Sequence, residues 1–204
     1  MSKIALIISS TRKGRVGLEV GKWLNSILED VGSDAEITMV DVAAFNLPVF
    51  DETVIPAMVP AMAQWTTAHA KAWSDEIAKY DGYVLLANEY NFGMSGSTKN
   101  AIDYLYHAWI GKPILIVTYG IMGGVHASNQ LKDVLTGMKT RPVDTRPQLK
   151  FIGGQSGPDV QKAMAGELGE ESKKAWSTEK KPEILKGFAE LIAALKEASS
   201  AVSS

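Results

Sequence analysis

The chain has 204 residues, of which 46% are hydrophobic and 22% charged, so we expect one domain with a full apolar core. A formal net charge of -2, with neither half strongly basic, argues against a general nucleic-acid binder. The absence of cysteine excludes disulfides, thiolate zinc sites, cysteine nucleophiles and cysteine-ligated iron–sulfur clusters. No apolar run approaches the roughly 20 residues that cross a bilayer, and no signal-peptide pattern is present. We therefore expect a cytoplasmic protein without membrane insertion.

The hydrophobic pattern alternates between two periods along the chain. Residues 4–8 form a continuous apolar run, which is typical of a strand buried on both faces of a parallel sheet. Apolar residues then recur at helical spacing from Val16 to Val31, and Gly32 is expected to end this helix. The elements predicted further along are strands over 37–40, 83–87, 113–117 and 148–152, helices over 61–80, 97–109, 131–138 and 184–195, and a proline-rich loop over 42–60.

Five strands alternating with helices predict an α/β fold, a doubly wound five-stranded parallel sheet with helices on both faces. We expect a single domain over residues 1–197 and a flexible Ala/Ser-rich tail over 198–204. The segment 153–181 is predicted to be a long loop that covers another part of the molecule. Ligands of such folds bind outside the carboxyl ends of the strands, so the loops that follow the strands are the candidate site.

The loop that follows the first strand has the composition of a phosphate site. Residues 9–17 read Ser-Ser-Thr-Arg-Lys-Gly-Arg-Val-Gly and open the first predicted helix. Hydroxyl groups, free amides at a helix N-terminus and three positive charges meet there, as a phosphate monoester requires. The sequence is neither a Walker A motif nor G-x-G-x-x-G, which disfavours ATP and a Rossmann-type dinucleotide. The alternative is a solvated loop that only caps the helix.

Two further loops combine aromatic residues with glycines. Residues 88–96, after the third strand, contain Tyr90, Phe92 and Gly93, and residues 118–124, after the fourth strand, contain three glycines. Aromatic rings can contact a planar heterocycle, and glycines let backbone amides approach it. Ordinary packing and tight turns are the alternatives for each loop taken singly. Because all three loops fall on one edge of one sheet, together they indicate a mononucleotide with a flat aromatic base.

The same residues resemble the NADPH-dependent FMN reductase family, which includes quinone reductases and azoreductases. The motif G-S-x-R stands here as residues 9–12, with Ser9 in place of glycine. The motif P-E-Y-N stands as residues 88–91, with Asn88 in place of proline, and K-N-A-I-D stands as residues 99–103. Residues 103–113 further resemble the fungal quinone reductases of this family. The similarity runs from about residue 3 to residue 140 and fades from Gly153 onward. The resemblance implies a flavodoxin-like fold and non-covalent FMN in a cleft completed by a second subunit.

Carried over position by position, the resemblance implies a set of FMN-binding residues. Those expected around the phosphate are Ser10, Arg12, Arg15, Val16 and Gly17. Those expected along the isoalloxazine ring are Glu89, Tyr90, Asn91, Phe92, Gly93, Tyr119, Gly120, Gly123 and Gly124. A homodimer or a dimer of dimers is expected. Trp65, Trp73 and Trp109 are candidate interface residues, although burial in the monomer core is the preferred interpretation for each.

The resemblance further implies that a hydride passes from NADPH or NADH to FMN and that two electrons then pass to a quinone, an azo compound or a flavin. We expect no essential acid–base side chain and no metal site; His126 is the histidine best placed to deliver a proton, while His69 and His107 are expected within helices. Two alternatives stay open. One is an FMN-binding electron carrier or redox-sensing module, and the other is a nucleotide-binding regulatory domain without flavin.

Overall fold

The computed structural model describes residues 1–31 and 35–202. The strands are β1 (Ser2–Ile8), β2 (Ala35–Asp41), β3 (Gly82–Tyr90), β4 (Gly93–Met94), β5 (Pro113–Gly120), β6 (Arg141–Pro142) and β7 (Gln148–Lys150). The α-helices are α1 (Gly17–Glu29), α2 (Ala68–Ile77), α3 (Gly96–Asp103), α4 (Val125–Gly137), α5 (Pro158–Met164), α6 (Glu170–Ala175) and α7 (Lys181–Val202). The short helical turns are η1 (Val42–Phe45), η2 (Pro56–Met58) and the π-helical η3 (Trp176–Lys180).

The predicted doubly wound parallel sheet is confirmed. The strands lie in the order β2-β1-β3-β5-β6, and each neighbouring pair along this path is parallel. The fifth position is shared by two short strands, because β6 pairs with the start of β5 and β7 with its end. β4 is the exception to the parallel pattern and forms a short antiparallel hairpin with β3.

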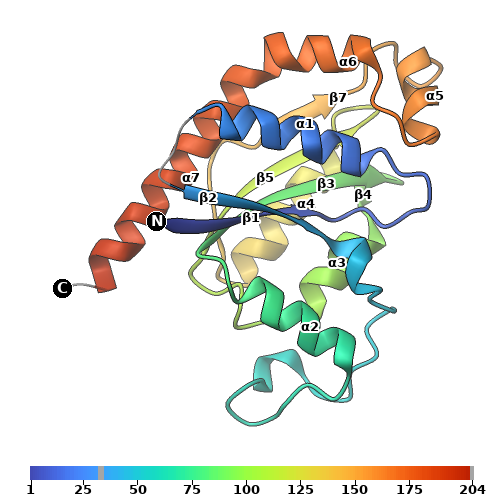
Figure 1. The fold of residues 1–204 in the computed structure, drawn as a ribbon. Coiled ribbons are helices and arrows are strands. Elements are labelled where there is room, and N and C mark those ends of the chain that lie inside the picture. Colours follow the sequence, from blue (N-terminus) through green and yellow to red (C-terminus); the bar gives the residue numbers. More distant parts are fainter. Residues whose placement is uncertain (32–34, 203–204) are drawn as a thin grey trace.

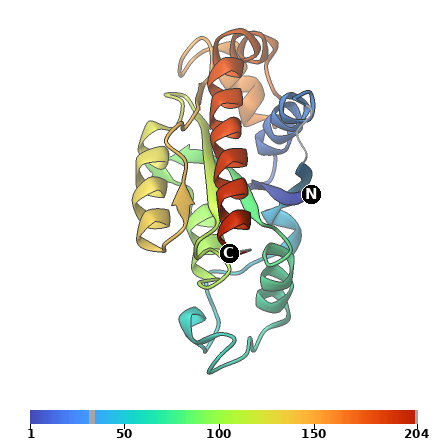
Figure 2. The ribbon, with the colours of Figure 1, turned by 90° about the vertical axis from the view of Figure 1, so that its left-hand side faces the viewer.

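Helices cover both faces of the sheet, as Figures 1 and 2 show. One apolar core lies between the sheet and helices α1 and α7, and the other lies between the sheet and helices α2, α3 and α4. Successive residues of each strand point to opposite faces, so Leu86 belongs to the first core and Leu85 to the second. The central strands are therefore apolar at consecutive positions, which explains the continuous runs in the sequence.

The predicted helix over 61–80 is wrong at its start, because α2 begins at Ala68. The side chain of Thr67 accepts a hydrogen bond from the amide of Ala70 at 3.4 Å and so caps the helix. The amides of Thr66 and Thr67 donate instead to the carboxylate of Glu52, which draws these residues into the preceding loop. The apolar stripe that includes Trp65 continues outside the helix and packs on the second core.

The segment 153–181 is not a loop but contains α5, α6 and η3. Pro158 opens α5, and the buried carboxylate of Asp159 accepts a hydrogen bond from the amide of Ser172 at 2.6 Å. Trp176 is buried, and its indole donates to the carbonyl of Lys150 at 2.7 Å. These contacts hold α5 and α6 beside the carboxyl end of the sheet (Figure 1).

The ends of three further helices differ from the prediction. α3 ends at Asp103, whereas the sequence predicted a helix to residue 109. α1 ends at Glu29, and Gly32, the expected stop, lies outside the described residues. α7 runs to Val202, so the predicted tail over 198–204 begins within this helix. Trp73 and Trp109 are buried in the monomer core, whereas Trp65 is half-buried. In the part of the chain that the structure describes, no helix combines the length and the apolar character needed to span a membrane.

Candidate functional site

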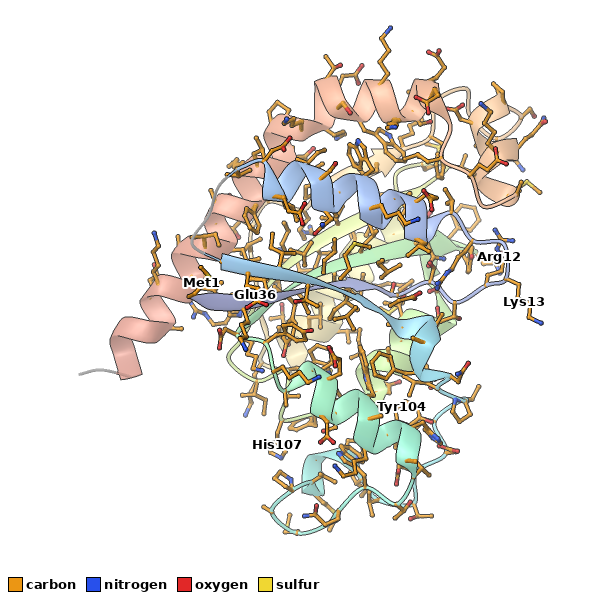
Figure 3. All side chains as sticks on the ribbon, in the orientation of Figure 1. Met1, Arg12, Lys13, Glu36, Tyr104 and His107 are labelled. Carbon is orange, nitrogen blue, oxygen red and sulfur yellow. The ribbon has the colours of Figure 1, made fainter. Side chains whose placement is uncertain are left out.

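The three loops identified from the sequence meet at the carboxyl ends of β1, β3 and β5. They surround a cavity of about 180 Å³, and Figure 3 shows Arg12 and Lys13 at this edge of the molecule. The residues that line it are Arg12, Arg15, Val16, Asn88, Glu89, Tyr90, Tyr119, Gly120, Ile121, Phe151, Val160, Ala163 and Met164. The cavity is smaller than the roughly 300 Å³ of an ordinary ligand pocket, so a nucleotide would also extend over the exposed loops.

Arg12 lines this cavity and is exposed to solvent. Its Nε donates to the hydroxyl of Tyr90 at 3.4 Å, and its Nη2 donates to the carbonyl of Gly14 at 3.0 Å. Its Nη1 lies 3.2 Å from the carbonyl of Lys13 and 3.5 Å from that of Met164. Arg12 therefore connects the first loop with the β3 loop and with the end of α5. These partners are uncharged groups, which leaves the positive charge available to an anion.

Val16 and Gly17 stand at the start of α1, against Ser10; Val16 lines the cavity, whereas Ser10 and Gly17 do not line it. A Cβ atom on Gly17 would lie 2.1 Å from Oγ of Ser10 and 2.5 Å from the hydroxyl of Tyr119, so only glycine fits. The hydroxyl of Ser10 is buried and makes no regular hydrogen bond among the described residues, although its interaction with the Tyr119 hydroxyl acts to lower the pKa of that tyrosine. The first amides of α1 likewise have no partner within the helix. The loop thus offers unmet donors beside a positive helix end, as an anionic group requires.

The loop after β3 is a tight hairpin rather than a flat platform. Asn91 and Phe92 form its turn with positive φ angles of 48° and 61°. The Phe92 ring is 76% exposed and meets the ring of His126 edge-on at 5.5 Å between centroids. Gly93 is buried, and a Cβ there would lie 2.8 Å from Oε1 of Gln130. Asn91, Phe92 and Gly93 do not line the cavity.

Glu89 lines the cavity and also has a structural partner. Its Oε2 accepts hydrogen bonds from the amides of His126 at 2.8 Å and Ala127 at 3.1 Å. A carboxylate at a helix N-terminus satisfies free amides and complements the helix dipole. Glu89 therefore caps α4 from the neighbouring strand and joins the second loop to the third.

The loop after β5 is shaped by its glycines. Gly123 and Gly124 have φ angles of 80° and 78°, and a Cβ on Gly124 would lie 2.8 Å from Cβ of Thr118. Gly120 lines the cavity, whereas Gly123 and Gly124 turn the chain into α4 and do not line it. Tyr119 is buried, and this burial raises the pKa of its hydroxyl to about 12. Tyr119 is therefore a neutral hydrogen-bonding group at physiological pH.

Several residues that line the cavity were not predicted from the sequence. They are Asn88, Ile121, Phe151, Val160, Ala163 and Met164. Asn88 and Ile121 belong to the loops predicted to form the site, so their position in the sequence could have identified them. The α5 residues lie in the segment where the likeness fades, and only its expected covering role pointed to them. Of the histidines, His69 lies in α2 as expected, but His107 lies in a turn after α3, where Nε2 is 2.8 Å from the carbonyl of Ala57.

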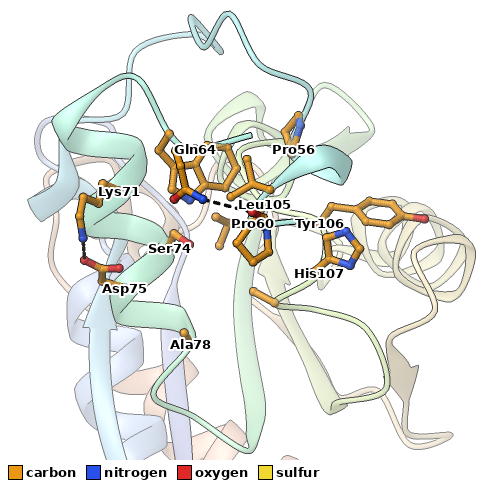
Figure 4. Close-up of a pocket in the computed structure, with 13 residues that line it drawn as sticks. Pro56, Pro60, Gln64, Lys71, Ser74, Asp75, Ala78, Leu105, Tyr106 and His107 are labelled. Carbon is orange, nitrogen blue, oxygen red and sulfur yellow. Dashed lines mark hydrogen bonds and ion pairs between the residues drawn. The ribbon is translucent and has the colours of Figure 1, made fainter. Parts of the chain in front are cut away.

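A second cavity, of about 510 Å³, lies between α2, the loop over 56–65 and residues 105–108 (Figure 4). An ion pair between Lys71 and Asp75, 2.5 Å long, lies at its wall. This second cavity shares no lining residue with the cavity at the sheet edge. None of the three predicted loops reaches it, so the candidate site is the smaller cavity.

The strand order and the cavity at the strand ends define the flavodoxin-like class of α/β folds. The model of the NADPH-dependent FMN reductase family matches residues 2–149. An NAD(P)H-dependent FMN reductase of a Nectria species, ntnL, is 48% identical over 201 residues, with 97% of this chain and 98% of that protein covered. The chain belongs to the NADPH-dependent FMN reductase family, and it is an FMN-dependent NAD(P)H oxidoreductase.

Two more distant proteins extend this comparison. A quinone reductase of Escherichia coli is 29% identical over 159 residues, with 74% of this chain and 77% of that protein covered. The solved structure of FerB, a flavoenzyme NAD(P)H:(acceptor) oxidoreductase from Paracoccus denitrificans, superposes with a TM-score of 0.65 at 18% identity. That superposition covers 96% of this chain and 98% of FerB, and it shows the shared fold.

The residues at the sheet edge fit a flavin mononucleotide. The buried carboxamide of Asn88 has no partner among the described residues, and Gly17 lets the start of α1 pack directly against Ser10 and Tyr119. Aromatic and aliphatic side chains line the rest of the cavity, beside the charge of Arg12. A flat ring carrying a phosphate has this combination of requirements.

Proposed function

We propose that the cavity at the ends of β1, β3 and β5 binds FMN without a covalent bond and that a small quinone, azo compound or flavin is the final electron acceptor. The observation that carries this proposal is the convergence of the three loops on one cavity. Reduced NADPH or NADH is the electron donor, in agreement with the family. Bound FMN supplies the chemistry of accepting a hydride and passing on two electrons.

The protein's part is binding, orientation and exclusion of water. The guanidinium of Arg12 and the first amides of α1 would hold the phosphate, because both present donors and positive charge. Tyr90 and Tyr119 would lie against the ring system, and α5 would cover the cavity through Val160, Ala163 and Met164. No side chain is required to transfer the hydride itself. His126 faces the outer side of the β3 hairpin through its contact with Phe92, from where it could deliver a proton to a reduced acceptor.

We propose further that the protein is a homodimer, or a dimer of such dimers. Apolar side chains stand exposed around the cavity, with Phe92 76% and Met122 59% exposed. A contiguous exposed apolar patch marks a protein interface, and a second subunit seated on this edge of the sheet would cover both side chains. Light scattering after size-exclusion chromatography tests this assembly. A reductase that consumes reduced nicotinamide works where that cofactor is kept reduced, so we place the protein in the cytoplasm.

The decisive experiment is an absorbance titration of the purified protein with FMN, followed by anaerobic addition of NADPH. We expect a bound-flavin spectrum that bleaches on addition of NADPH and returns when a quinone is added. Bound flavin that neither NADPH nor NADH reduces would indicate an electron carrier. Failure to bind FMN would contradict the proposed function.

A further inference from the structure

Three polar residues form a row across the central strands of the sheet. Asn88 of β3 lies opposite Tyr119 of β5 in the parallel register. Ile8 lies opposite Leu86, so Ser10 and Asn88 each follow that pair by two residues. Side chains two residues apart share a face, which places the row on the face of Leu86 and α1. The row therefore lies under the N-terminus of α1, where Gly17 comes close to Ser10 and Tyr119.

The carboxamide of Asn88 is buried without a partner. The residue is 3% exposed, and neither Nδ2 nor Oδ1 has a hydrogen bond among the described residues. A buried polar group without a partner lowers the stability of the protein, so native proteins seldom leave one unpaired without a function. The opposite face of the same strand ends is satisfied: Ser9 Oγ donates to the carbonyl of Leu86 at 3.0 Å, and Thr118 Oγ1 donates to that of Gly123 at 2.9 Å. The unpaired polar groups therefore lie on the face of the sheet that borders the cavity.

The surroundings of Asn88 restrict what its partner can be. Asn88 lines the cavity together with the rings of Tyr90, Tyr119 and Phe151, so the cavity suits a flat ligand. A carboxamide presents one donor beside one acceptor. Its matching partner is a planar group with a carbonyl beside an N–H, that is, an amide or imide edge.

We propose that Asn88 recognises the amide or imide edge of a planar heteroaromatic ligand in this cavity. The inference rests on the proposed function, because two such edges occur there: the pyrimidine edge of the flavin and the carboxamide of nicotinamide. The family motif P-E-Y-N has proline at this position. The proposed contact of Asn88 is therefore a property of this chain and not of the motif.

The test compares the wild type with Asn88→Leu, and with Asn88→Ala in case the larger side chain does not fold. Two quantities are measured: the thermal stability of the flavin-free protein and the dissociation constant of FMN from fluorescence quenching. A third is the dissociation constant of tetrahydro-NADPH, which cannot transfer hydride, for the FMN-loaded protein. Thr140→Val is the matched control, because Thr140 Oγ1 is also buried without a described partner but lies away from the cavity.

We expect Asn88→Leu to keep or raise the stability of the flavin-free protein, since it replaces an unpaired polar group by an apolar one of similar size. An FMN dissociation constant raised about tenfold would identify the flavin edge as the partner. An unchanged FMN constant with a tenfold weaker tetrahydro-NADPH would identify the nicotinamide. Both constants unchanged in the variants would overturn the inference while leaving the proposed function intact. A wild type that does not bind FMN would overturn the proposed function and this inference with it.

Discussion

Nη2 of Arg15 lies 2.5 Å from Oδ2 of Asp41, the last residue of β2. The other nitrogen of the same guanidinium, Nη1, donates to the carbonyl of Ser10, and the Arg15 side chain is mostly buried. Arg15 therefore holds the first loop against the end of β2, and its charge is balanced within the protein. Arg12 differs, since it forms no ion pair within residues 1–31 and 35–202. The two arginines that look equivalent in the sequence have different roles.

The Arg15–Asp41 pair is expected to stabilise the fold. Arg15→Met and Asp41→Asn should each lower the free energy of unfolding by about 1–2 kcal/mol, because each leaves a partly buried charge unpaired. Chemical denaturation of both single variants and of the double variant measures the coupling, which we expect to be about 1 kcal/mol. Strict additivity of the two losses would show that the pair contributes nothing.

Arg12 is expected to bind the FMN phosphate. Arg12→Ala should raise the FMN dissociation constant about tenfold or more, because it removes a charge-assisted contact. The rate of hydride transfer in the flavin-saturated enzyme should change little, since the ring would remain in place. Lys13→Ala is the matched control. It removes the same positive charge from the neighbouring residue, but Lys13 does not line the cavity. An equal loss of affinity in both variants would indicate a general field effect instead of a direct contact.

Gly17 is expected to tolerate no side chain. Gly17→Ala places a Cβ 2.1 Å from Oγ of Ser10, so the start of α1 must shift, at a cost of about 1–3 kcal/mol. Gly96→Ala serves as the comparison, because Gly96 is likewise the first residue of its helix but nothing lies within 4 Å of its added Cβ. Thermal unfolding should show a lower midpoint for Gly17→Ala only. FMN affinity should fall in the same variant.

Glu52 is expected to make stability depend on pH under acidic conditions. Burial acts to raise the pKa of its carboxyl, but hydrogen bonds from the amides and hydroxyls of Thr66 and Thr67 outweigh burial and hold the pKa at about 2. Because the folded pKa lies below the ordinary 4.5, this stabilisation is complete above about pH 4.5 and is lost as the pH falls towards 2.

The variant Glu52→Gln should therefore lower the free energy of unfolding by about 2 kcal/mol at pH 7, with a smaller difference from the wild type at pH 3. Urea unfolding at a series of pH values measures this difference. Glu36→Gln is the control, since Glu36 is exposed and its loss should have little effect at any pH. A difference for Glu52→Gln that stays constant from pH 7 to pH 3 would show that the carboxylate charge is not responsible.

The strands of the sheet could be read from the sequence because each has its own local signal. Runs such as residues 4–8 are apolar at every position, and a strand buried on both faces requires this pattern wherever it stands. The edge element near residues 148–152 had a weaker signal, and it is a three-residue strand that shares its position with β6. The start of α2 could not be read, since the apolar stripe through Trp65 continues beyond the helix and only the contacts of Glu52 show where the helix begins.

The sequence alone determined the alternation of strands and helices and the three loops that meet at one edge of the sheet. These properties follow from hydrophobic period and from the rule that parallel strands end on the same side. The tertiary structure decided which residues share the cavity: the α5 wall, the partnership of Arg15 with Asp41, the capping of α4 by Glu89 and the unpaired carboxamide of Asn88. Each of these depends on how residues far apart in the chain are brought together, and no local sequence pattern encodes that.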